Sequence, residues 1–193
     1  MRDVALLGVR LLLGGYLAAH GAQKLFGSFD GPGLDKAGAG FERMGLTPGR
    51  QMAAVAGATE LAGGVLTASG IAHPAGPLAI IGAMSVAATT HRGRGALAAK
   101  GGFELPLTNL ATALALVAAG PGRIKIGPLL PKPLAVAGAV AGAAMAGSSI
   151  YRLIAAGREA KTAPQARPTP APAEASASAP AAQPRTTAHG ATS

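Results

Sequence analysis

Five apolar stretches, each close to the length of a membrane-crossing helix, constrain this sequence more than any other feature. They cover residues 4–25, 51–71, 74–90, 104–120 and 133–154. A helix needs about 20 predominantly apolar residues to cross the hydrocarbon core of a bilayer. The pattern therefore predicts an all-α integral membrane protein, in which four helices form the core of a helical bundle and the last stretch adds a fifth transmembrane helix.

The composition agrees with a membrane location. Charged residues make up 13% of the chain, whereas a soluble domain carries about 25%. The net charge of +9 is spread over the segments between and after the apolar stretches, with no basic module and no aromatic stacking platform. Attraction to anionic lipid explains such charge better than nucleic-acid binding does. We therefore expect the lipid bilayer as a partner and no nucleic acid.

Cysteine is absent from the sequence, which excludes disulfides, thiol redox chemistry and thiolate-bound zinc or iron–sulfur clusters within this chain. No dinucleotide-binding glycine motif lies between a strand and a helix. A redox role would therefore need a bound cofactor, such as a quinone, or a partner protein. No recognisable motif encodes a cofactor, and we predict no metal site.

The chain divides into three parts by composition. Residues 1–126 hold the four-helix domain, residues 127–158 hold a linker and the fifth helix, and residues 159–193 form a Pro/Ala-rich tail. The tail has little to bury, so we expect it to be disordered. A Gly/Pro-rich loop after the first stretch is expected to hold a short amphipathic helix around 34–45. The first stretch begins like a signal peptide, but Arg10 inside it favours a retained helix.

The positions of lysine and arginine predict the orientation in the membrane. One side carries Lys36, Arg43, Arg50, Arg92, Arg94, Lys100, Arg158, Lys161 and Arg167. The other side carries Arg2, Arg123, Lys125 and Lys132. Basic residues collect in cytoplasmic segments. We therefore expect a protein of the cell (cytoplasmic) membrane with its N-terminus outside and its C-terminal tail in the cytoplasm.

Polar residues inside the first two stretches indicate a site. His20 and Lys24 are four residues apart and share a helix face, although Lys24 also fits snorkelling to the headgroups. Glu60 lies about 14 Å deep at 1.5 Å per residue, where an ionised side chain costs roughly 2.5–3.5 kcal/mol unless it is paired or neutral. We expect a structural ion pair between Arg10 and Glu60, with His20 and Lys24 free to line a pocket.

His91 and Glu104 close the third stretch and open the fourth, so they lie at the same membrane face as Lys24. Glu104 also fits a helix start, where a carboxylate favours the helix dipole, and His91 also fits an ordinary interfacial histidine. Because the polar groups come from several helices, we predict a pocket with no assigned catalytic residue. Its members are His20, Lys24, Glu60, His91 and Glu104.

The motifs "HGAQKLFG", "ATELAGGVLTASG", "HRGRG" and "GGFELPLTNLATALALVAAGPGR" occur in this order. Through these motifs the chain resembles the DoxX family of bacterial membrane proteins over about residues 4–126. The resemblance implies a four-helix bundle in the cytoplasmic membrane and places Lys24, Glu60, His91 and Glu104 on recurring polar positions. It also implies a link to quinone-reducing or stress-related oxidoreductase complexes, since some relatives have such links. The fifth helix and the tail are additions to the family pattern.

Three functions stay open at this point. The chain is expected to be the membrane subunit of a redox-linked complex that acts on quinones or in thiol and oxidative stress, with a soluble oxidoreductase as partner. A non-catalytic membrane scaffold or assembly partner is the first alternative, and a small-solute transporter that uses Glu60 is the second. Whether the chain is itself an enzyme, and whether it forms oligomers, is left open by the sequence.

Overall fold

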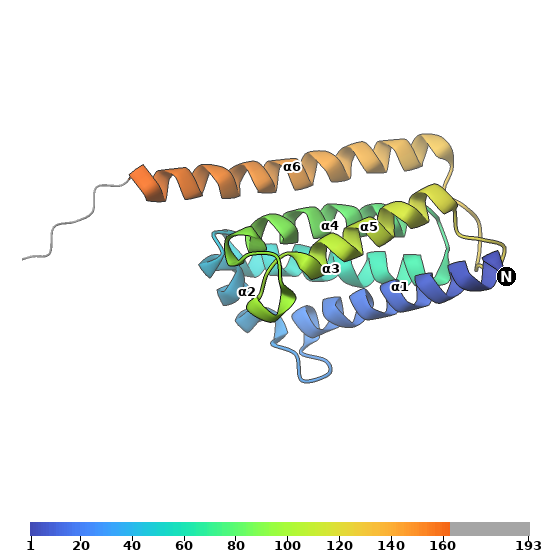
Figure 1. Cartoon of the computed structure of the whole chain (residues 1–193), viewed down its shortest axis with the longest axis horizontal. Helices are drawn as coiled ribbons and strands as arrows, with labels where there is room; N and C mark the ends of the chain where they lie inside the picture. The colour runs from blue at the N-terminus through green and yellow to red at the C-terminus, as the bar shows by residue number, and fades with distance from the viewer. Residues whose placement is uncertain (163–193) are drawn as a thin grey trace, which may run out of the picture. The chain divides into compact units, whose positions relative to one another are not determined.

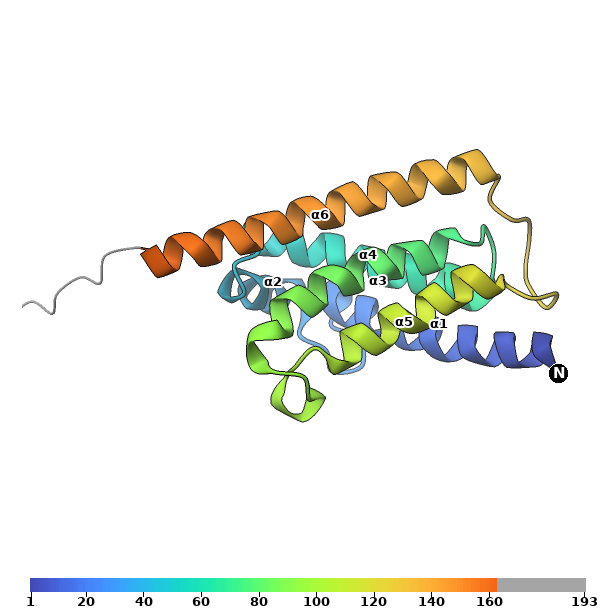
Figure 2. The same ribbon diagram turned by 45° about the horizontal axis from the view of Figure 1, so that its top comes forward.

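The computed structural model describes residues 1–162, and these residues form helices joined by loops (Figure 1). The elements are α1 (Arg2–Phe26), α2 (Gly33–Arg43), α3 (Gly49–Ser69), α4 (Ala75–His91), the short helices η1 (Arg92–Arg94) and η2 (Ala98–Lys100), α5 (Glu104–Ala119) and α6 (Lys132–Thr162). The five long helices run side by side, each antiparallel to the one before it (Figures 1 and 2). The predicted all-α bundle is confirmed.

The loops lie at two opposite ends of the bundle (Figure 1). The N-terminus, the turn between α3 and α4 and the linker between α5 and α6 share one end, which we call the Met1 end. Helix α2 and the η1–η2 loop lie at the other end, which we call the α2 end. Helix α2 matches the short amphipathic helix expected around 34–45.

Within residues 1–162, three helices are long and apolar enough to cross a membrane, namely α1, α3 and the Lys132–Arg158 part of α6. Helix α5 is apolar but shorter. With 17 residues in α4 and 16 in α5, these two helices span about 26 and 24 Å, against a hydrocarbon core of about 30 Å. A membrane helical bundle is therefore established, whereas five complete crossings stay a prediction.

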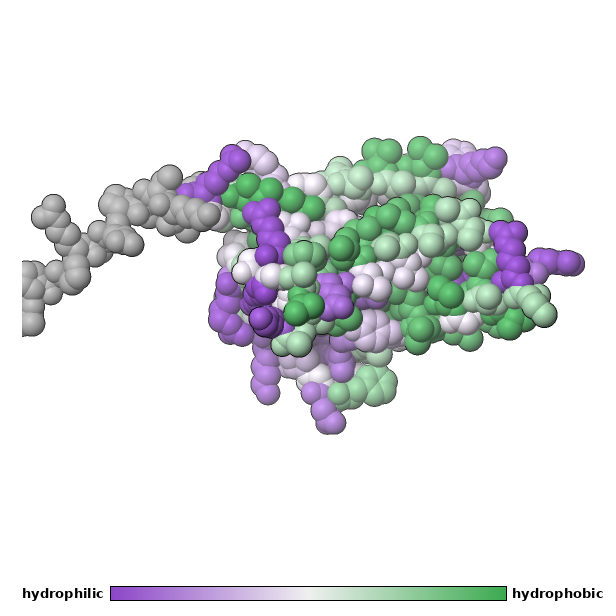
Figure 3. All heavy atoms as spheres, in the orientation of Figure 1, coloured by the Kyte–Doolittle hydropathy of each residue, from purple (hydrophilic) through white to green (hydrophobic). Residues whose placement is uncertain are grey.

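The surface has the polarity that a bilayer requires. Hydrophobic side chains cover the flank of the bundle on the face shown in Figure 3, and hydrophilic ones gather at its two ends. Large apolar side chains are exposed along the helices, among them Leu12, Val65 and Val140. A small core of Leu13, Leu17, Ile80, Met84, Ala113 and Leu116 joins α1, α4 and α5 inside. Exposed apolar area on this scale marks a surface that faces lipid or a partner.

Helices α1 and α3 pack through glycines spaced seven residues apart. A Cβ added to Gly14 would lie 2.5 Å from the carbonyl oxygen of Gly64, and a Cβ added to Gly21 would lie 2.5 Å from that of Gly57. Residues seven apart lie on nearly the same helix face, so both pairs belong to one seam. Small residues let helix backbones approach closely inside a membrane. This glycine seam fixes the register of α1 against α3.

Substitution of a seam glycine is expected to destabilise the bundle. Gly14→Ala places a methyl group where the backbone of α3 already lies, and overpacking of this kind costs about 1–3 kcal/mol. Gly15 is the matched control, because a Cβ at Gly15 meets nothing within 4 Å and alanine favours a helix over glycine by up to about 1 kcal/mol. Thermal unfolding in detergent should therefore separate the two variants. Equal melting temperatures would contradict the close-packed seam.

Helix α6 packs along α4, where a Cβ on Gly82 would lie 3.9 Å from the carbonyl oxygen of Gly142. It continues to Thr162, a few residues past the boundary at 158 that composition suggested. The sequence there, "REAKT", contains helix-favouring Ala, Glu and Lys residues, which explains the longer helix. The rest of the predicted tail lies outside the described residues.

Candidate functional site

A cavity of about 660 Å³ extends along α4 and α6 from Ala75 and Leu130 to His91, and α1, α2 and α3 complete its lining. Its walls along α4 and α6 are mostly apolar, with residues such as Leu78, Val86 and Met145. Its polar lining comes from Lys24, Thr59, Glu60, Thr90, His91 and Ser149. The cavity therefore combines an apolar volume with a small number of convergent polar groups, as small-molecule sites in proteins usually do.

Lys24 and Glu60 form an ion pair in this cavity. Nζ of Lys24 lies 2.5 Å from Oε2 of Glu60, and the two side chains are 22% and 9% exposed. The glycine seam positions the pair, since Gly21 of α1 faces the stretch of α3 from Gly57 to Leu61, and this stretch contains Glu60. Each charge is thus compensated within the membrane part of the bundle, which removes most of the cost of burying it alone.

The expected ion pair between Arg10 and Glu60 is not formed, and the helix geometry explains why. Lys24 is three residues from Gly21, about 5 Å along the axis, whereas Arg10 is eleven residues away, about 16 Å. Side chains also lean toward the N-terminus of their own helix. Lys24 and Glu60 stand on antiparallel helices and lean toward each other, while Arg10 leans away toward the Met1 end.

His91 ends α4 and supplies an imidazole to the cavity. Its Nδ1 lies 2.8 Å from the carbonyl oxygen of Ala87 and 3.0 Å from Oγ1 of Thr90. A carbonyl oxygen only accepts hydrogen bonds, so Nδ1 carries the proton in the neutral ring and Nε2 keeps its lone pair. His91 can therefore accept a hydrogen bond or a proton at Nε2.

His20 and Glu104 do not line the cavity. The ring of His20 packs edge-on against Tyr16, with centroids 4.4 Å apart, and interacts electrostatically with Lys24 and Glu60. Oε2 of Glu104 accepts a hydrogen bond of 2.9 Å from the backbone N–H of Ala98, at the first turn of α5. Glu104 therefore fixes the preceding loop and favours the helix dipole. Of the five predicted pocket residues, the structure brings Lys24, Glu60 and His91 together.

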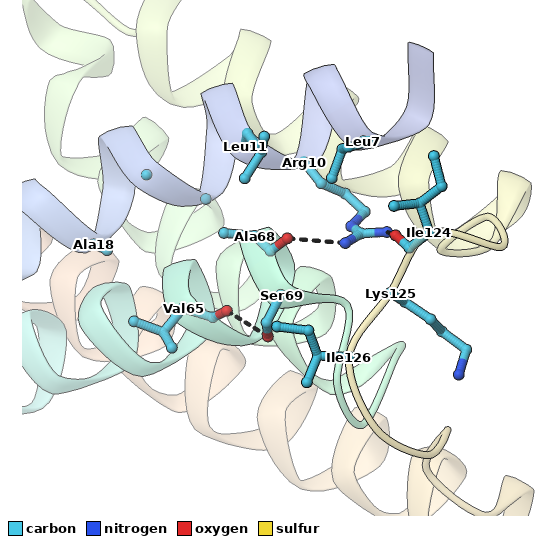
Figure 4. A pocket seen from close by; sticks show the side chains of 12 residues that line it. Leu7, Arg10, Leu11, Ala18, Val65, Ala68, Ser69, Ile124, Lys125 and Ile126 are labelled. Atoms are coloured by element: carbon cyan, nitrogen blue, oxygen red, sulfur yellow. Dashed lines mark hydrogen bonds between the residues drawn. The ribbon is translucent and has the colours of Figure 1, made fainter. Parts of the chain in front are cut away.

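Arg10 caps the C-terminal end of α3 at the other end of the bundle. Its Nε donates to the carbonyl oxygen of Thr67 at 3.0 Å. Its Nη2 donates to the carbonyl oxygen of Ala68 at 2.9 Å (Figure 4). Its Nη1 donates to the carbonyl oxygens of Pro121 and Ile124 in the α5–α6 linker. The last carbonyls of a helix lack partners within it, and a cation there complements the helix dipole. Arg10 is therefore a structural clamp between α1, α3 and the linker.

The linker is also tied to the turn between α3 and α4 by three backbone hydrogen bonds. The N–H groups of Ile126, Ala72 and Leu130 donate to the carbonyl oxygens of Ser69, Pro128 and His73 respectively. Leu130 lines the cavity and directly precedes α6. The clamp at the Met1 end therefore also sets where α6 begins.

Acidification is expected to weaken this end of the fold through His73, which is 8% exposed. Burial, and then the positive charge of Arg10, lower the pKa of His73 below its ordinary value of 6.5. The unfolded chain therefore binds a proton at a higher pH than the folded one, so stability is complete above about pH 6.5 and decreases as the pH falls below it.

The control variant for this prediction is His73→Gln, which cannot titrate. The melting temperature of the natural protein in detergent should fall more between pH 7.5 and 5.5 than that of His73→Gln, because the other histidines are common to both. Parallel pH profiles would show that the folded protein accepts a charged His73 without cost.

The contribution of α6 to the cavity was not predicted. Small residues four positions apart, Gly138, Gly142 and Ala146, face the cavity from α6. This spacing is typical of helix faces that approach another helix closely in a membrane. It was therefore the feature of the sequence from which packing of α6 against the bundle could have been predicted. Among residues 1–162, no group of three or more His, Cys, Asp or Glu side chains could hold a metal ion.

A comparison with protein families finds one match over the first part of the chain. The DoxX family model matches residues 5–93. The matched region includes Arg10, Lys24, Glu60 and His91, and it ends before Glu104. Neither a curated protein nor a solved structure matches the chain.

Proposed function

This chain belongs to the DoxX family through its residues 5–93, and from that premise we propose that it is the membrane subunit of a redox-linked complex. In this proposal the cavity holds a small amphiphilic molecule whose quinone-like ring lies beside Lys24, Glu60 and His91. One observation carries the proposal. The cavity offers about 660 Å³ of mostly apolar space with an ion pair and an imidazole in its lining.

The polar groups suit the two oxygens of such a ring in its oxidised and reduced forms. The Lys24 ammonium has three N–H donors, so it can donate to a carbonyl oxygen of the ligand while it stays paired with Glu60. Nε2 of His91 can accept from a ligand hydroxyl group. The chain itself contains no cysteine, so a soluble oxidoreductase partner would supply two electrons, and the bound quinone would take them up with two protons to become the quinol.

A scaffold role is the second candidate, and the same ion pair favours it. Lys24 and Glu60 already satisfy each other at 2.5 Å, so their burial between α1 and α3 is explained without any ligand. In that case the bundle would serve only to hold a partner protein at the membrane.

The orientation belongs to the same proposal. Lys36, Arg43, Arg50, Arg92, Arg94 and Lys100 lie in the segments at the α2 end, and Arg2, Arg123, Lys125 and Lys132 lie at the Met1 end. The larger positive charge predicts that the α2 end faces the cytoplasm. The end of the cavity at His91 would then lie near the cytoplasmic side of the cell membrane, within reach of a soluble partner.

The test is a titration of the purified full-length protein in lipid nanodiscs with a short-chain quinone, using ubiquinone-1 as the probe. His91→Ala should weaken binding by about two- to tenfold, because one hydrogen bond contributes about 0.5–1.5 kcal/mol. Glu104→Ala is the control outside the cavity and should leave binding unchanged.

A second pair of variants tests the location of the bound ring. Gly142→Leu fills the cavity from α6 beside Gly82, whereas Gly147→Leu does not line it, and neither glycine has an atom within 4 Å of an added Cβ. Quinone binding should be lost in the first variant and kept in the second. No saturable binding by the natural protein, or equal binding by both leucine variants, would favour the scaffold role.

A further inference from the structure

A second hollow lies between α1 and α3 at the Met1 end, with a volume of about 560 Å³ (Figure 4). None of the described residues lines both this groove and the cavity. Leu11, Gly15 and Ala18 of α1, Val65 of α3 and Ile126 of the linker give it an apolar lining, and Arg10 and Lys125 line it as well. The groove is therefore a separate site with two basic residues.

The Met1 end carries positive charge that the described residues do not neutralise. Arg10 is 2% exposed, and within residues 1–162 no carboxylate lies within ion-pair distance of it. Its four carbonyl partners supply dipoles but no negative charge. Lys125 donates to the carbonyl oxygen of Gly127, again a neutral acceptor. Arg123 directly precedes Ile124, which lines the groove, and the Asp3 carboxylate accepts a hydrogen bond from the backbone N–H of Arg123 and not from its guanidinium.

We propose that this groove binds an anionic phospholipid, with its phosphate at Lys125 and Arg123 and one acyl chain along α1 and α3. The polarity agrees with this occupant, since the basic residues lie at the loop end and the apolar, small residues lie toward the middle of the helices. A phospholipid places its phosphate at the membrane surface and its chains inward, in the same order.

The length of the groove agrees as well. On α1 it extends from Leu7 to Ala18, about 17 Å at 1.5 Å per residue. This is close to half of a hydrocarbon core about 30 Å thick, which is the depth that one leaflet's acyl chains occupy. A second copy of this chain fits less well as the occupant. A helix packed in the groove would supply apolar contacts, but it would not supply a negative charge to compensate Arg10 and Lys125.

The experiment is native mass spectrometry of the full-length protein extracted from vesicles of equal parts dioleoyl-phosphatidylglycerol and dioleoyl-phosphatidylcholine. We expect the protein to retain the anionic lipid about fivefold over the zwitterionic one for each basic side chain engaged. Arg123→Gln combined with Lys125→Gln should bring the two lipids to parity.

A matched pair of glycine variants tests the acyl-chain position. Gly15 and Gly8 both lie on α1 with nothing within 4 Å of an added Cβ, and only Gly15 lines the groove. Gly15→Leu should lower the retained phosphatidylglycerol, whereas Gly8→Leu should not. Equal retention by both variants, equal retention of the two lipids, or a Gly15-sensitive dimer in place of bound lipid would overturn the proposal. None of these outcomes bears on quinone binding in the cavity.

Discussion

Lys24→Met is expected to destabilise the protein by about 3–5 kcal/mol, the usual cost of breaking a buried ion pair from one side. The substitution keeps an unbranched side chain on α1 but leaves the Glu60 carboxylate, 9% exposed, without its cation. The free energy of unfolding in detergent or mixed micelles is the measurement.

The pair itself is isolated by a double-mutant cycle. Glu60→Gln alone leaves Lys24 without its counter-charge, and Lys24→Met combined with Glu60→Gln should cost less than the sum of the single changes. The exposed pair of Arg50 and Asp35, with side chains 70% and 87% exposed, is the control. Arg50→Met should change stability by no more than about 1 kcal/mol. Additive effects of Lys24→Met and Glu60→Gln would mean that the two charges do not interact.

Arg10→Met is expected to be at least as damaging. It removes four donated hydrogen bonds and leaves four carbonyl oxygens at the junction of α1, α3 and the linker. A buried acceptor left without a partner costs about 1–3 kcal/mol. Only the bond to Thr67 is fully buried and the other three are partly buried, so we expect a total loss of about 3–5 kcal/mol. Arg10→Lys should restore little, because an ammonium group cannot reproduce the planar fork of the guanidinium.

The Arg10 prediction has its control on the same helix. Arg2 also donates to a helix-terminal carbonyl oxygen, that of Ala119 at the end of α5, but this contact is exposed. Arg2→Met should therefore cost far less than Arg10→Met in the same thermal unfolding assay. Hydrogen exchange of the linker adds a local measurement, since the amides of Ile126 and Leu130 should lose protection in Arg10→Met. Unchanged protection there would show that the linker is held without the clamp.

The two ends of α1 thus have different chemistry, although both carry a basic residue among apolar ones. Arg10 has a structural role, because its guanidinium donates hydrogen bonds to four backbone carbonyl oxygens and pairs with no carboxylate among the described residues. Lys24 serves both architecture and the cavity, because it neutralises Glu60 and still has donors to offer. This reverses part of the sequence-based expectation, in which Arg10 compensated Glu60 and Lys24 stayed free for a ligand.

The sequence by itself determined the helices and where they change direction. Long, predominantly apolar runs satisfy their backbone hydrogen bonds in a membrane as helices, and the Gly/Pro-rich segments between them end each run. The glycines beside Glu60 also indicated a close helix contact, because residues seven apart keep one face along a helix. The grouping of Lys24, Glu60 and His91 followed from their depth and from the side of the membrane on which each run ends.

Only the tertiary structure decided which cation pairs with Glu60 and which helix closes the cavity. Arg10 and Lys24 lie on the same face of α1, so charge and periodicity favour both equally. The choice depends on the register of α1 against α3, which the glycine seam sets, and on the opposite lean of side chains on antiparallel helices. The place of α6 depends on the linker that Arg10 and the α3–α4 turn hold. These contacts join residues at least 36 positions apart, and hydrophobic patterning within a single helix carries no information about them.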